Sequence, residues 1–544
     1  MNDVKTYKDY FDFELSSQQT KVFDALCAFE QDSKAKIFVL KGYAGTGKTS
    51  LIGGFIKKLN ADWKKSQENS DTKDNNSQVY GNEEKEPPFV VLASTGRVAK
   101  ILSDKTIVNV KTIHSLVYRF VGLSQDVDKS IKQSNTQIDA FGQMYLDFDA
   151  VQIDNTQVVT YIVDEASMVS DKKTPQTSTA NIGDGNVLDA LMNYDKKGKF
   201  IFVGDPCQLP PINQKESPAL DAEYLRKKYN VSVTEYTLTE IFRQQENNDI
   251  LKAASVIRNL WQDSNNDSIP KKYVDSGYFG KQIAFDPLPL RGYNRINVFQ
   301  SEIELYTKYI QAIKENGYEY ATLICNSNAE CSKMSNLVRE SFHGKREPLI
   351  VGDLLLVTQN NYVVDLVNGD LVEVEEVGET KIRAGLHFTN VRVKELASKQ
   401  SYNTLLLFDL LRDNLPNING VQHWMLMMDF IERMVARGIK FKPDVYDAFT
   451  KNKLPKITKE SFKDNLHFEA FRKNMLSDPF LNALRTAYGY ALTCHKSQGG
   501  EWNQIFLYMG TSIFRRRSSE LYQWAYTAIT RAKEYLYVNN RNIK

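Results

Sequence analysis

The 544-residue chain is short of the features that define several classes of protein. Its five cysteines include no C-x-x-C pair, which argues against a zinc finger or an iron–sulfur cluster. It has no run of about 18 apolar residues, the minimum for a membrane span, and its first residues contain no apolar signal core. We therefore expect an intracellular, soluble (cytoplasmic) protein with reduced thiols and no membrane partner.

An excess of charge of one sign is also missing. The chain has 69 Lys and Arg against 67 Asp and Glu, so its formal net charge is only +2. Overall charge gives no reason to expect a nucleic-acid partner, and any surface that binds one must be locally basic. The chain is too long for a single hydrophobic core, so several domains are expected.

Short apolar runs that alternate with helix-period segments predict parallel α/β sheets. These runs lie at residues 37–40, 89–93, 158–163, 200–203 and 321–325. After about residue 350 come β-type runs with a turn signal at Asn368–Gly369, and residues 400–475 then have helical periodicity. The α/β pattern returns at residues 486–493. We therefore predict a second α/β domain that is interrupted by a small β-barrel module and a helical insert.

Two polar segments have too few apolar residues to support a core. Between Trp63 and Phe89 the sequence is mostly Asn, Ser, Lys and Glu, so residues 63–88 are predicted to be a mobile surface insertion. Residues 171–186 have a similar composition. Both segments are expected to lie outside the predicted sheets.

The sharpest motif is GYAGTGKT at residues 42–49, which matches the pattern G-x-x-x-x-G-K-[ST]. An apolar run precedes it and an amphipathic helix pattern follows it. Glycines let backbone N–H groups turn inward around phosphates, helped by the positive end of the helix. Lys48 is expected to reach the β- and γ-phosphates of ATP, and Thr49 to hold Mg²⁺. The residues predicted to bind the nucleotide here are Gly42, Gly45, Thr46, Gly47, Lys48, Thr49 and Ser50.

Two further strand ends are predicted to complete this site. The run 158–163 leads directly into Asp164 and Glu165. Asp164 can bind Mg²⁺, and Glu165 can polarise the attacking water as a general base. An Asp-Glu pair is usually solvated surface, but a P-loop in the same chain favours the catalytic interpretation. The run 200–203 leads into GDPCQLPP, in which Gln208 is a neutral donor suited to sensing the γ-phosphate.

Together these motifs resemble those of superfamily 1 helicases, most closely the RecD/Dda-like branch. The likeness is carried by GYAGTGKT, VDEASM, GDPCQLPP, TCHKSQGGE and YTAITRAK, in that order, and spans about residues 13–540. It implies two RecA-like domains with ATP and Mg²⁺ between them. It further implies a DNA helicase that moves 5′→3′ along single-stranded DNA, with duplex or fork DNA and repair or replication proteins as partners.

The resemblance also assigns individual residues. Gln19, in LSSQQ, falls on a glutamine that reads adenine, and Arg531 falls on an arginine finger. The catalytic residues implied are Lys48, Asp164, Glu165, Gln208, Arg243 and Arg531. The DNA contacts implied are Thr95, Gly96, Arg97, Thr112, His114, Asn326, His495, Lys496, Ser497 and Gln498. Hydroxyl, backbone and cationic contacts of this kind carry little sequence information.

The same reasoning divides the chain into domains. The first RecA-like domain is predicted from residues 1–115 and 156–245, and the second from residues 246–349 and 485–544. Residues 116–155 form a small inserted subdomain, the expected place of a strand-separating pin, although no aromatic pin stands out. Residues 350–484 are the β-barrel-like and helical insert.

Structural roles compete with several assignments. His114 could bond locally at a helix start, Arg97 could be a surface salt-bridge partner, and His495–Lys496 could be a solvated helix start. The stretch Tyr522–Tyr526 is expected to be helix core rather than a base-stacking platform, and Arg515–Arg517 a solvated loop. For the whole protein, the alternatives are a DNA-stimulated ATPase subunit of a nuclease or remodelling complex, or an RNA motor.

Overall fold

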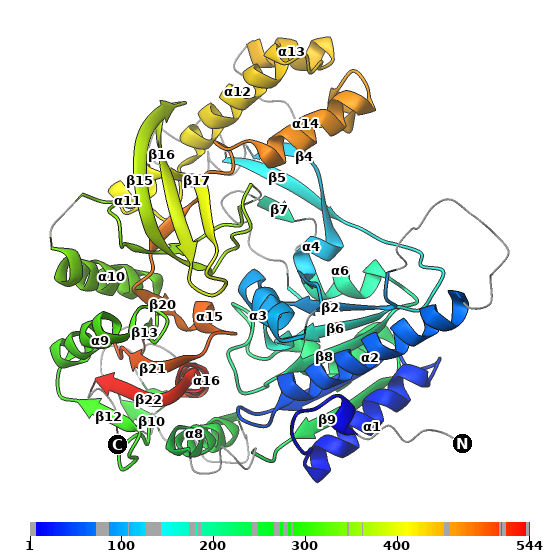
Figure 1. Ribbon diagram of the computed structural model, residues 1–544, viewed down its shortest axis with the longest axis vertical. Helices are drawn as coiled ribbons and strands as arrows, with labels where there is room; N and C mark the ends of the chain where they lie inside the picture. The colour runs from blue at the N-terminus through cyan, green and yellow to red at the C-terminus, as the bar shows by residue number, and fades with distance from the viewer. Residues whose placement is uncertain are drawn as a thin grey trace.

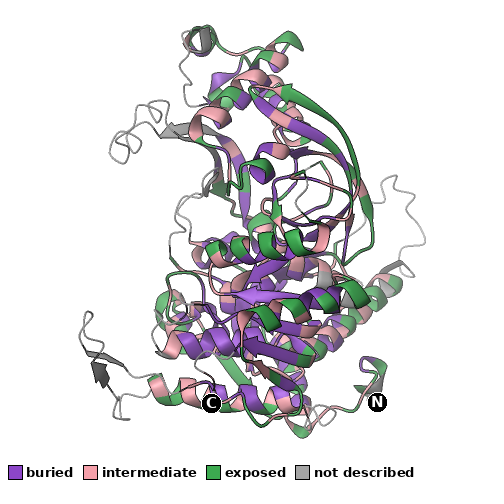
Figure 2. Ribbon diagram, turned by 90° about the vertical axis from the view of Figure 1, so that its left-hand side faces the viewer, coloured by how far each residue is buried: buried purple, intermediate pink, exposed green. Residues whose placement is uncertain are grey.

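In the computed structural model, two sheets occupy one half of the molecule and a third sheet with helices lies above them (Figure 1). The buried residues follow the strands of the two lower sheets (Figure 2). The structure describes residues 7–71, 86–106, 108–126, 143–172, 180–182, 186–241, 248–265, 273–275, 281–283, 287–344, 347–361, 363–450, 457–510, 513, 518–539 and 543.

The first sheet is parallel and six-stranded, in the order β3-β2-β6-β8-β1-β9. Its strands are β1 (Ile37–Gly42), β2 (Phe89–Ala93), β3 (Val110–Thr112), β6 (Thr160–Asp164), β8 (Lys199–Gly204) and β9 (Val233–Leu238). Its helices are α1 (Ser17–Gln31), α2 (Lys48–Asp71), α3 (Gly96–Thr106), α4 (Ile113–Val117), α6 (Val187–Tyr194) and α7 (Ala222–Tyr229). The three motif-bearing strands β1, β8 and β6 are neighbours, so their carboxyl ends bring the motifs together.

The second sheet is also parallel, in the order β12-β22-β21-β13-β20. Its strands are β12 (Ile296–Phe299), β13 (Ala321–Cys325), β20 (Ala491–Thr493), β21 (Trp502–Leu507) and β22 (Ala532–Asn539). The helices with it are α8 (Asp249–Asn265), α9 (Glu302–Asn316), α10 (Asn328–His343), α15 (Cys494–Ser497) and α16 (Ser518–Ile529). Tyr522, Trp524 and Tyr526 of α16 are buried, which confirms the prediction of helix core. The two parallel sheets confirm the predicted α/β class.

An antiparallel sheet interrupts the second parallel one, in the order β17-β16-β15-β14-β19. Its strands are β14 (Leu354–Val357), β15 (Leu371–Arg383), β16 (Leu386–Glu395), β17 (Ser401–Leu407) and β19 (Thr486–Tyr488). The helices α11 (Phe408–Arg412), α12 (Gly420–Ala436), α13 (Pro443–Thr450) and α14 (Asn465–Ser477) follow β17. The described pairings give an open order. An isolated bridge joins Leu406 of β17 to Leu484, just before β19, and a closed barrel stays a prediction.

A fourth sheet joins two inserts that are far apart in the chain, in the order β18-β4-β5-β7. Its strands are β4 (Tyr118–Asp126), β5 (Gln143–Ala150), β7 (Ala180–Ile182) and β18 (Ile457–Thr458). Gly122 of β4 allows the close approach of β18, because a Cβ there would lie 2.3 Å from the Ile457 carbonyl oxygen. Phe120 of β4 shares a core with Phe430 and Phe471 of α12 and α14. The inserted subdomain and the helical insert are therefore one body.

Several predicted boundaries differ from the structure. The helix α2 continues to Asp71, so the first part of the predicted insertion 63–88 is helical. Residues 486–488 form the edge strand β19 of the antiparallel sheet, whereas the sequence predicted them in the parallel one. They pair there because Gly489 permits close approach: a Cβ on it would lie 3.0 Å from the Leu355 backbone. Part of the segment 171–186 is the strand β7, which pairs with β5.

Some predictions fall on parts of the chain that are outside the described residues. These are Arg243, Arg515–Arg517, residues 72–85 of the predicted insertion, and residues 127–142 between β4 and β5. The hairpin of β10 (Tyr273–Asp275) and β11 (Lys281–Ile283) is described. Among the described residues, no helix combines the length and the apolar character needed to cross a membrane.

Candidate nucleotide and nucleic-acid site

The P-loop lies between the end of β1 and the start of α2. Gly45 and Gly47 have φ angles of 79° and 78°, a left-handed conformation that glycine adopts at little cost. A Cβ on Gly42 would lie only 2.8 Å from Lys48 Cγ and from Thr46 Oγ1. The loop therefore needs its glycines to form a phosphate-sized cradle at the N-terminus of α2. In the first turn of α2, Thr49 is half-buried and Ser50 is exposed.

Gln19 supports this loop from behind. Its side chain is buried, and its Nε2 donates a hydrogen bond of 3.1 Å to the Thr46 carbonyl oxygen. Its Oε1 accepts from the Ser16 backbone N–H at 3.0 Å, within the capping box of α1. Both ends of the amide are thus engaged by the protein, and reading of adenine by Gln19 stays a prediction.

The acidic pair lies at the end of β6, whose last residue is Asp164. Glu165 has a φ of 51°, a conformation that costs a residue with a side chain of order 1–3 kcal/mol and is typical of functional sites. Its N–H donates to Asp164 Oδ1 at 2.9 Å. Burial raises the pKa of the Glu165 carboxyl, while the positive charges of Arg531 and Lys48 act to lower it. The carboxyl is thus influenced by one cation from each half of the chain.

A buried hydroxyl connects the two halves of the site. Tyr526 Oη, on α16, donates to Asp205 Oδ2 at 2.7 Å and accepts from the P-loop N–H of Ala44 at 2.8 Å. Burial raises the pKa of Asp205, while Lys48 and the hydrogen bond from Tyr526 act to lower it. Sequence reasoning missed Asp205 and Tyr526 as site residues, although a buried tyrosine hydroxyl usually has a partner.

We expect Tyr526→Phe to weaken this connection without disturbing the packing of the ring. The variant removes the hydrogen bonds of Tyr526 to Asp205 Oδ2 and the Ala44 N–H, while Asp205 Oδ1 keeps its bond from the Cys207 N–H, so the free energy of unfolding should fall by about 1–3 kcal/mol. Urea denaturation measures the change. Tyr535→Phe is the control, since that ring is exposed, and should shift stability by less than about 0.5 kcal/mol. Equal losses in the two variants would contradict the role given to Tyr526.

The loop after β8 docks against the second half of the chain. Leu209 N–H donates to Thr527 Oγ1 at 2.9 Å, and Gln498 Nε2 donates to the Leu209 carbonyl at 3.4 Å. Gln208 is buried beside them, and the side-chain oxygens of Gln208 and Gln498 have no hydrogen-bond partner among the described residues. Buried acceptors without partners are rare in folded proteins, so these two amides are poised to gain one from a ligand or a movement.

Arg531 lies just after α16 and is buried. Its Nε donates to the Thr527 carbonyl at 3.2 Å. Its charge acts to lower the pKa of both Glu165 and Asp205. The charge of Arg531 thus acts on carboxyls of the first half, and the catalytic roles assigned from the sequence stay predictions.

Tyr43 makes a second contact across the halves that sequence reasoning missed. The Arg258 guanidinium, on α8, lies 4.2 Å from the centre of the Tyr43 ring, and Gln262 Nε2 donates to the Tyr43 hydroxyl at 3.3 Å. The ring and the hydroxyl of Tyr43 are thus both contacted by α8, which belongs to the second half of the chain. The motif pattern leaves position 43 free, so it gives no signal for this role.

The predicted DNA-contact residue Arg97 lies under the antiparallel insert. Its guanidinium stacks over the Trp502 ring at 4.9 Å, and its Nη1 is buried without a hydrogen-bond partner among the described residues. Burial lowers the pKa of Arg97. A Cβ on the neighbouring Gly96 would lie 2.4 Å from Val367. Arg97 thus stacks on an aromatic ring and does not form, with the described residues, the surface salt bridge that was its alternative role.

The loops around Thr95 and Thr112 begin helices. Thr95 Oγ1 accepts from Val98 N–H at 3.4 Å and Thr112 Oγ1 from Ser115 N–H at 3.2 Å, so both hydroxyls cap helix N-termini. His114 is exposed, in the first turn of α4. Its ring lies 5.8 Å from the Tyr118 ring, and burial of the imidazole lowers the pKa of His114.

In the second half, the predicted DNA-contact residues divide by burial. Ser497 and Gln498 are buried, and Ser497 Oγ donates to the Cys494 carbonyl at 2.8 Å. His495 and Lys496 are half-buried, and Lys496 lines a cavity of about 390 Å³. Burial lowers the pKa of Lys496. Asn326 follows β13, and its N–H donates to Glu330 Oε2 at 3.2 Å. Ser497 and Gln498 offer no surface in this conformation.

Two family models match the chain and cover most of these motifs. The model described as an AAA domain matches residues 14–267, and the model described as a UvrD-like helicase C-terminal domain matches residues 488–539. The first match contains the P-loop, Glu165 and Gln208, and the second contains Arg531. The fold and site are those of a P-loop ATPase whose nucleotide site is shared by two parallel sheets. Within that class, the two matches agree with the resemblance to superfamily 1 helicases of the RecD-like branch.

Relatives at low identity span nearly all of the chain. An uncharacterized protein of Acanthamoeba polyphaga mimivirus is 24% identical over 554 residues, covering 96% of this chain and 99% of the relative. An uncharacterized protein of Methanocaldococcus jannaschii is 22% identical over 528 residues, covering 93% of this chain but only 36% of the relative.

Solved helicase structures also align over most of the chain. Pif1 helicase from Candida albicans aligns with 97% of this chain and 95% of its own, at 16% identity and a TM-score of 0.43. A Pif1 helicase from Bacteroides, solved with ADP-AlF3 and single-stranded DNA, aligns with 98% of this chain and 94% of its own. The latter has 16% identity and a TM-score of 0.40.

Proposed function

We propose that this protein is an ATP-dependent DNA helicase that moves 5′→3′ along single-stranded DNA and separates the strands of a duplex. The observation that carries the proposal is the docking of α16, from the second half, on the nucleotide loops of the first: the Tyr526 hydroxyl bonds Asp205 and the P-loop N–H of Ala44. A nucleotide bound between the two halves bridges two bodies, so its hydrolysis can drive their relative movement. The direction of travel rests on the resemblance to the RecD/Dda-like branch.

The residues fit ATP with Mg²⁺. The P-loop offers backbone N–H groups, Lys48 and a helix N-terminus to the phosphates. Thr49 and Asp164 would hold the ion together with phosphate oxygens, as Mg²⁺ sites in proteins usually do. Among the described residues there is no cluster of three or more His, Cys, Asp or Glu that could hold a metal. The ion, when bound, neutralises charge on the phosphates.

The side chains then have separate roles in hydrolysis. Glu165 accepts a proton from the attacking water, while Lys48 and Arg531 stabilise negative charge on the transferred phosphoryl group. Arg243, by its resemblance, adds a second arginine. Gln208 is buried in the loop after β8. The next residue, Leu209, bonds Thr527 and Gln498, so Gln208 can report the γ-phosphate to them. Loss of the γ-phosphate removes this bridge and loosens the contact between the halves.

Single-stranded DNA is proposed to cross the carboxyl ends of both parallel sheets. The residues assigned to it on the first sheet are Thr95, Gly96, Arg97, Thr112 and His114. On the second sheet they are Asn326, His495, Lys496, Ser497 and Gln498. In this proposal, residues 1–115 with 156–245 and residues 246–349 with 485–544 act as the two RecA-like domains. Arg97 and Gln498 must change partners for the strand to bind.

ATP hydrolysis with and without single-stranded DNA tests the proposal. We expect strong stimulation by DNA in the wild type and loss of nearly all hydrolysis in Lys48→Ala, because the amine no longer reaches the phosphates. Lys57→Ala, on the exposed face of the same helix, is the matched control and should hydrolyse ATP normally. A forked duplex with one labelled strand then tests unwinding. Stimulated hydrolysis without displacement of that strand would favour the ATPase-subunit alternative.

A further inference from the structure

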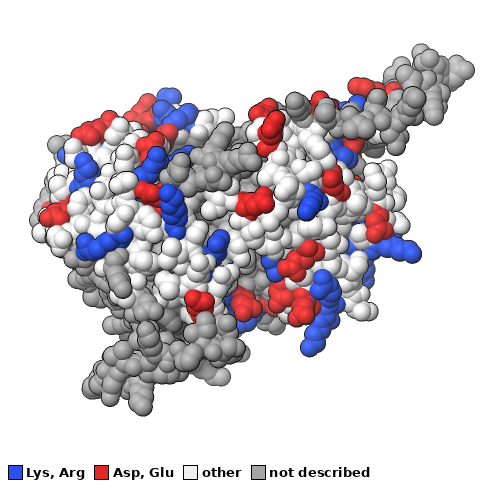
Figure 3. All heavy atoms as spheres, turned by 90° about the horizontal axis from the view of Figure 1, so that it is seen from below, with Lys and Arg blue, Asp and Glu red and all other residues white. Residues whose placement is uncertain are grey.

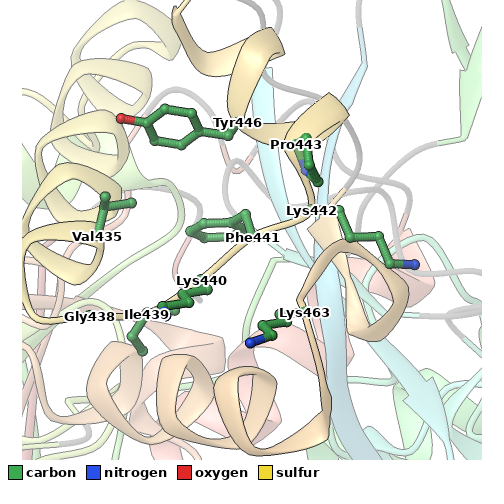
Figure 4. A pocket seen from close by; sticks show the side chains of 9 residues that line it. All are labelled: Val435, Gly438, Ile439, Lys440, Phe441, Lys442, Pro443, Tyr446 and Lys463. Atoms are coloured by element: carbon green, nitrogen blue, oxygen red, sulfur yellow. The ribbon is translucent and has the colours of Figure 1, made fainter.

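The end of the helical insert carries a pocket that the proposed motor does not use. It has a volume of about 630 Å³ and lies between the end of α12, the start of α13 and the start of α14 (Figure 4). Three lysines and two aromatic residues stand out in its lining, namely Lys440, Lys442, Lys463, Phe441 and Tyr446. We refer to these five residues as the lysine pocket.

The surroundings of the lysine pocket are basic in a chain that is nearly neutral. In the described parts of this stretch, residues 437–450 and 457–463, there are five Lys and Arg and three Asp and Glu. By contrast, the face seen from below mixes both signs among uncharged residues (Figure 3). Such a local excess of positive charge is what an otherwise neutral protein needs for binding a polyanion.

The lysines of the pocket are not engaged in the structure of the insert. All three are exposed, and none has a carboxylate within ion-pair distance in the part of the chain that the structure describes. The arginines of the neighbouring helices behave differently: Arg433 pairs with Asp478, and Arg472 pairs with Glu469. These two arginines are thus used for internal pairing. The lysines form no ion pair among the described residues, although the pKa of Glu460, lowered first by a hydrogen bond from Thr458, is also lowered by the charge of Lys442.

The backbone fixes two of the lysines beside each other. Lys463 N–H donates to the Lys440 carbonyl at 3.0 Å, and Phe441 forms a bridge with Phe462. Figure 4 shows the Phe441 ring between Tyr446 and Lys463, with Lys442 pointing away on the other side. The pocket therefore has one lysine, Lys463, next to the Phe441 ring and another, Lys442, at its outer edge.

The aromatic residues favour an unpaired strand as the occupant. Tyr446 is 46% exposed, and a large exposed aromatic ring in a pocket that lysines also line is typical of sites where single-stranded bases stack. The bases of a duplex are stacked on each other and cannot enter such a pocket. The volume lies within the range of about 300–1,000 Å³ found for pockets that hold small ligands, so there is room for a base.

The location of the pocket indicates which strand it meets. Phe441 packs against the core that also contains Phe120 of β4, so the pocket is built onto the inserted subdomain where a pin is expected. The helices α12 to α14 lie at the opposite end of the molecule from β1, β8 and α16, which carry the nucleotide site (Figure 1). A strand held here is therefore not the strand that crosses the parallel sheets.

We propose that the lysine pocket binds the displaced strand of a DNA fork, with phosphates on Lys440, Lys442 and Lys463 and a base on Tyr446. The inference rests on the proposed helicase function. Holding the displaced strand on the body that separates the duplex keeps it from pairing again behind the motor.

The test compares two labelled substrates that share the same duplex and the same loading strand. One has an unpaired arm on the displaced strand and the other lacks it. We expect wild type to bind the armed fork more tightly without nucleotide. A triple variant, Lys440→Gln with Lys442→Gln and Lys463→Gln, should lose that preference. It should also lower the salt dependence of armed-fork binding by a slope of about 2, the value for three phosphates of a single strand.

Further variants separate the pocket from general charge effects. Tyr446→Ala should weaken binding of the armed fork by roughly tenfold, the size of one base-stacking contact. The control is Lys21→Gln with Lys57→Gln and Lys227→Gln, which removes three exposed lysines from the first half and should keep the preference. ATP hydrolysis stimulated by single-stranded DNA should be unchanged in every variant.

Two results would overturn the inference. One is an equal loss of binding for both substrates, which would mean that the pocket contacts the duplex or the loading strand. The other is a triple variant that behaves like the control. Failure of the proposed function is distinguishable, because it appears as wild-type hydrolysis that DNA does not stimulate, whereas fork binding is measured without ATP.

Discussion

Arg531→Ala should lower DNA-stimulated ATP hydrolysis by about 10³- to 10⁵-fold, the contribution typical of an arginine finger. The physical reason is the position of the guanidinium: it is buried, it comes from the second sheet, and its charge reaches Glu165 and Asp205 of the first. In a site closed to water, such a cation stabilises charge on the transferred phosphoryl group far more than it would in bulk solvent.

Steady-state hydrolysis at saturating single-stranded DNA measures this loss, and equilibrium binding of a fluorescent ATP analogue shows whether the nucleotide still binds. Lys533→Ala is the matched control, because Lys533 is exposed two residues away and makes only a long contact of 3.9 Å with Glu501. Circular dichroism checks that the variant keeps its fold without the bond to Thr527. An Arg531→Ala protein that keeps its rate within tenfold would remove the second sheet from catalysis.

Glu165→Gln should reduce turnover by about 10²- to 10⁴-fold while both ATP and DNA still bind. The amide has the same shape but cannot take a proton from water. Because bound ATP is no longer hydrolysed, the variant should accumulate in the ATP-bound state, in which the two halves are held together. Single-turnover hydrolysis measures the chemical step, and the strand affinity is measured with ATP present.

The pH dependence gives a second readout for Glu165. Burial raises the pKa of its carboxyl, and a base must be deprotonated to act. As the pH is lowered, the wild-type rate should therefore begin to fall at a pH above the ordinary pKa of a glutamate. Glu223→Gln, on the exposed face of α7, is the control and should keep the wild-type rate and profile. A Glu165→Gln variant with a normal rate would assign the base to another group.

The parallel sheets could be predicted because full burial leaves a direct signal. Strands covered on both faces are apolar throughout, and residues 37–40, 200–203 and 321–325 became β1, β8 and β13 on that basis. The motifs followed, because each is tied to a strand end. The convergence of Lys48 with Arg531 was predicted only through the family resemblance, since nothing local in the sequence reports a contact across the chain.

What the sequence did not predict depends on contacts between distant segments. The strand β18 has two residues, too few for a periodic pattern, and it exists because β4 offers an edge. The role of Tyr526 depends on Asp205 and Ala44, which are distant in the sequence. The sequence around Tyr526 therefore predicted only a buried helix. The polar end of α2 is a different case, because a helix that is already formed extends through residues that would not start one.

The pairing of β4 with β18 also constrains how the chain can be synthesised. Leu123 of β4 pairs with Ile457 of β18. When the first insert leaves the ribosome, this edge of β4 is unpaired, and it stays unpaired until residue 457 has been made. Open edges invite pairing with other chains, and domains generally fold in the order of their synthesis. A fragment that ends before residue 457 should therefore aggregate, even though its P-loop sheet is complete. Successful production of this protein then depends on keeping its nascent first half apart from its neighbours.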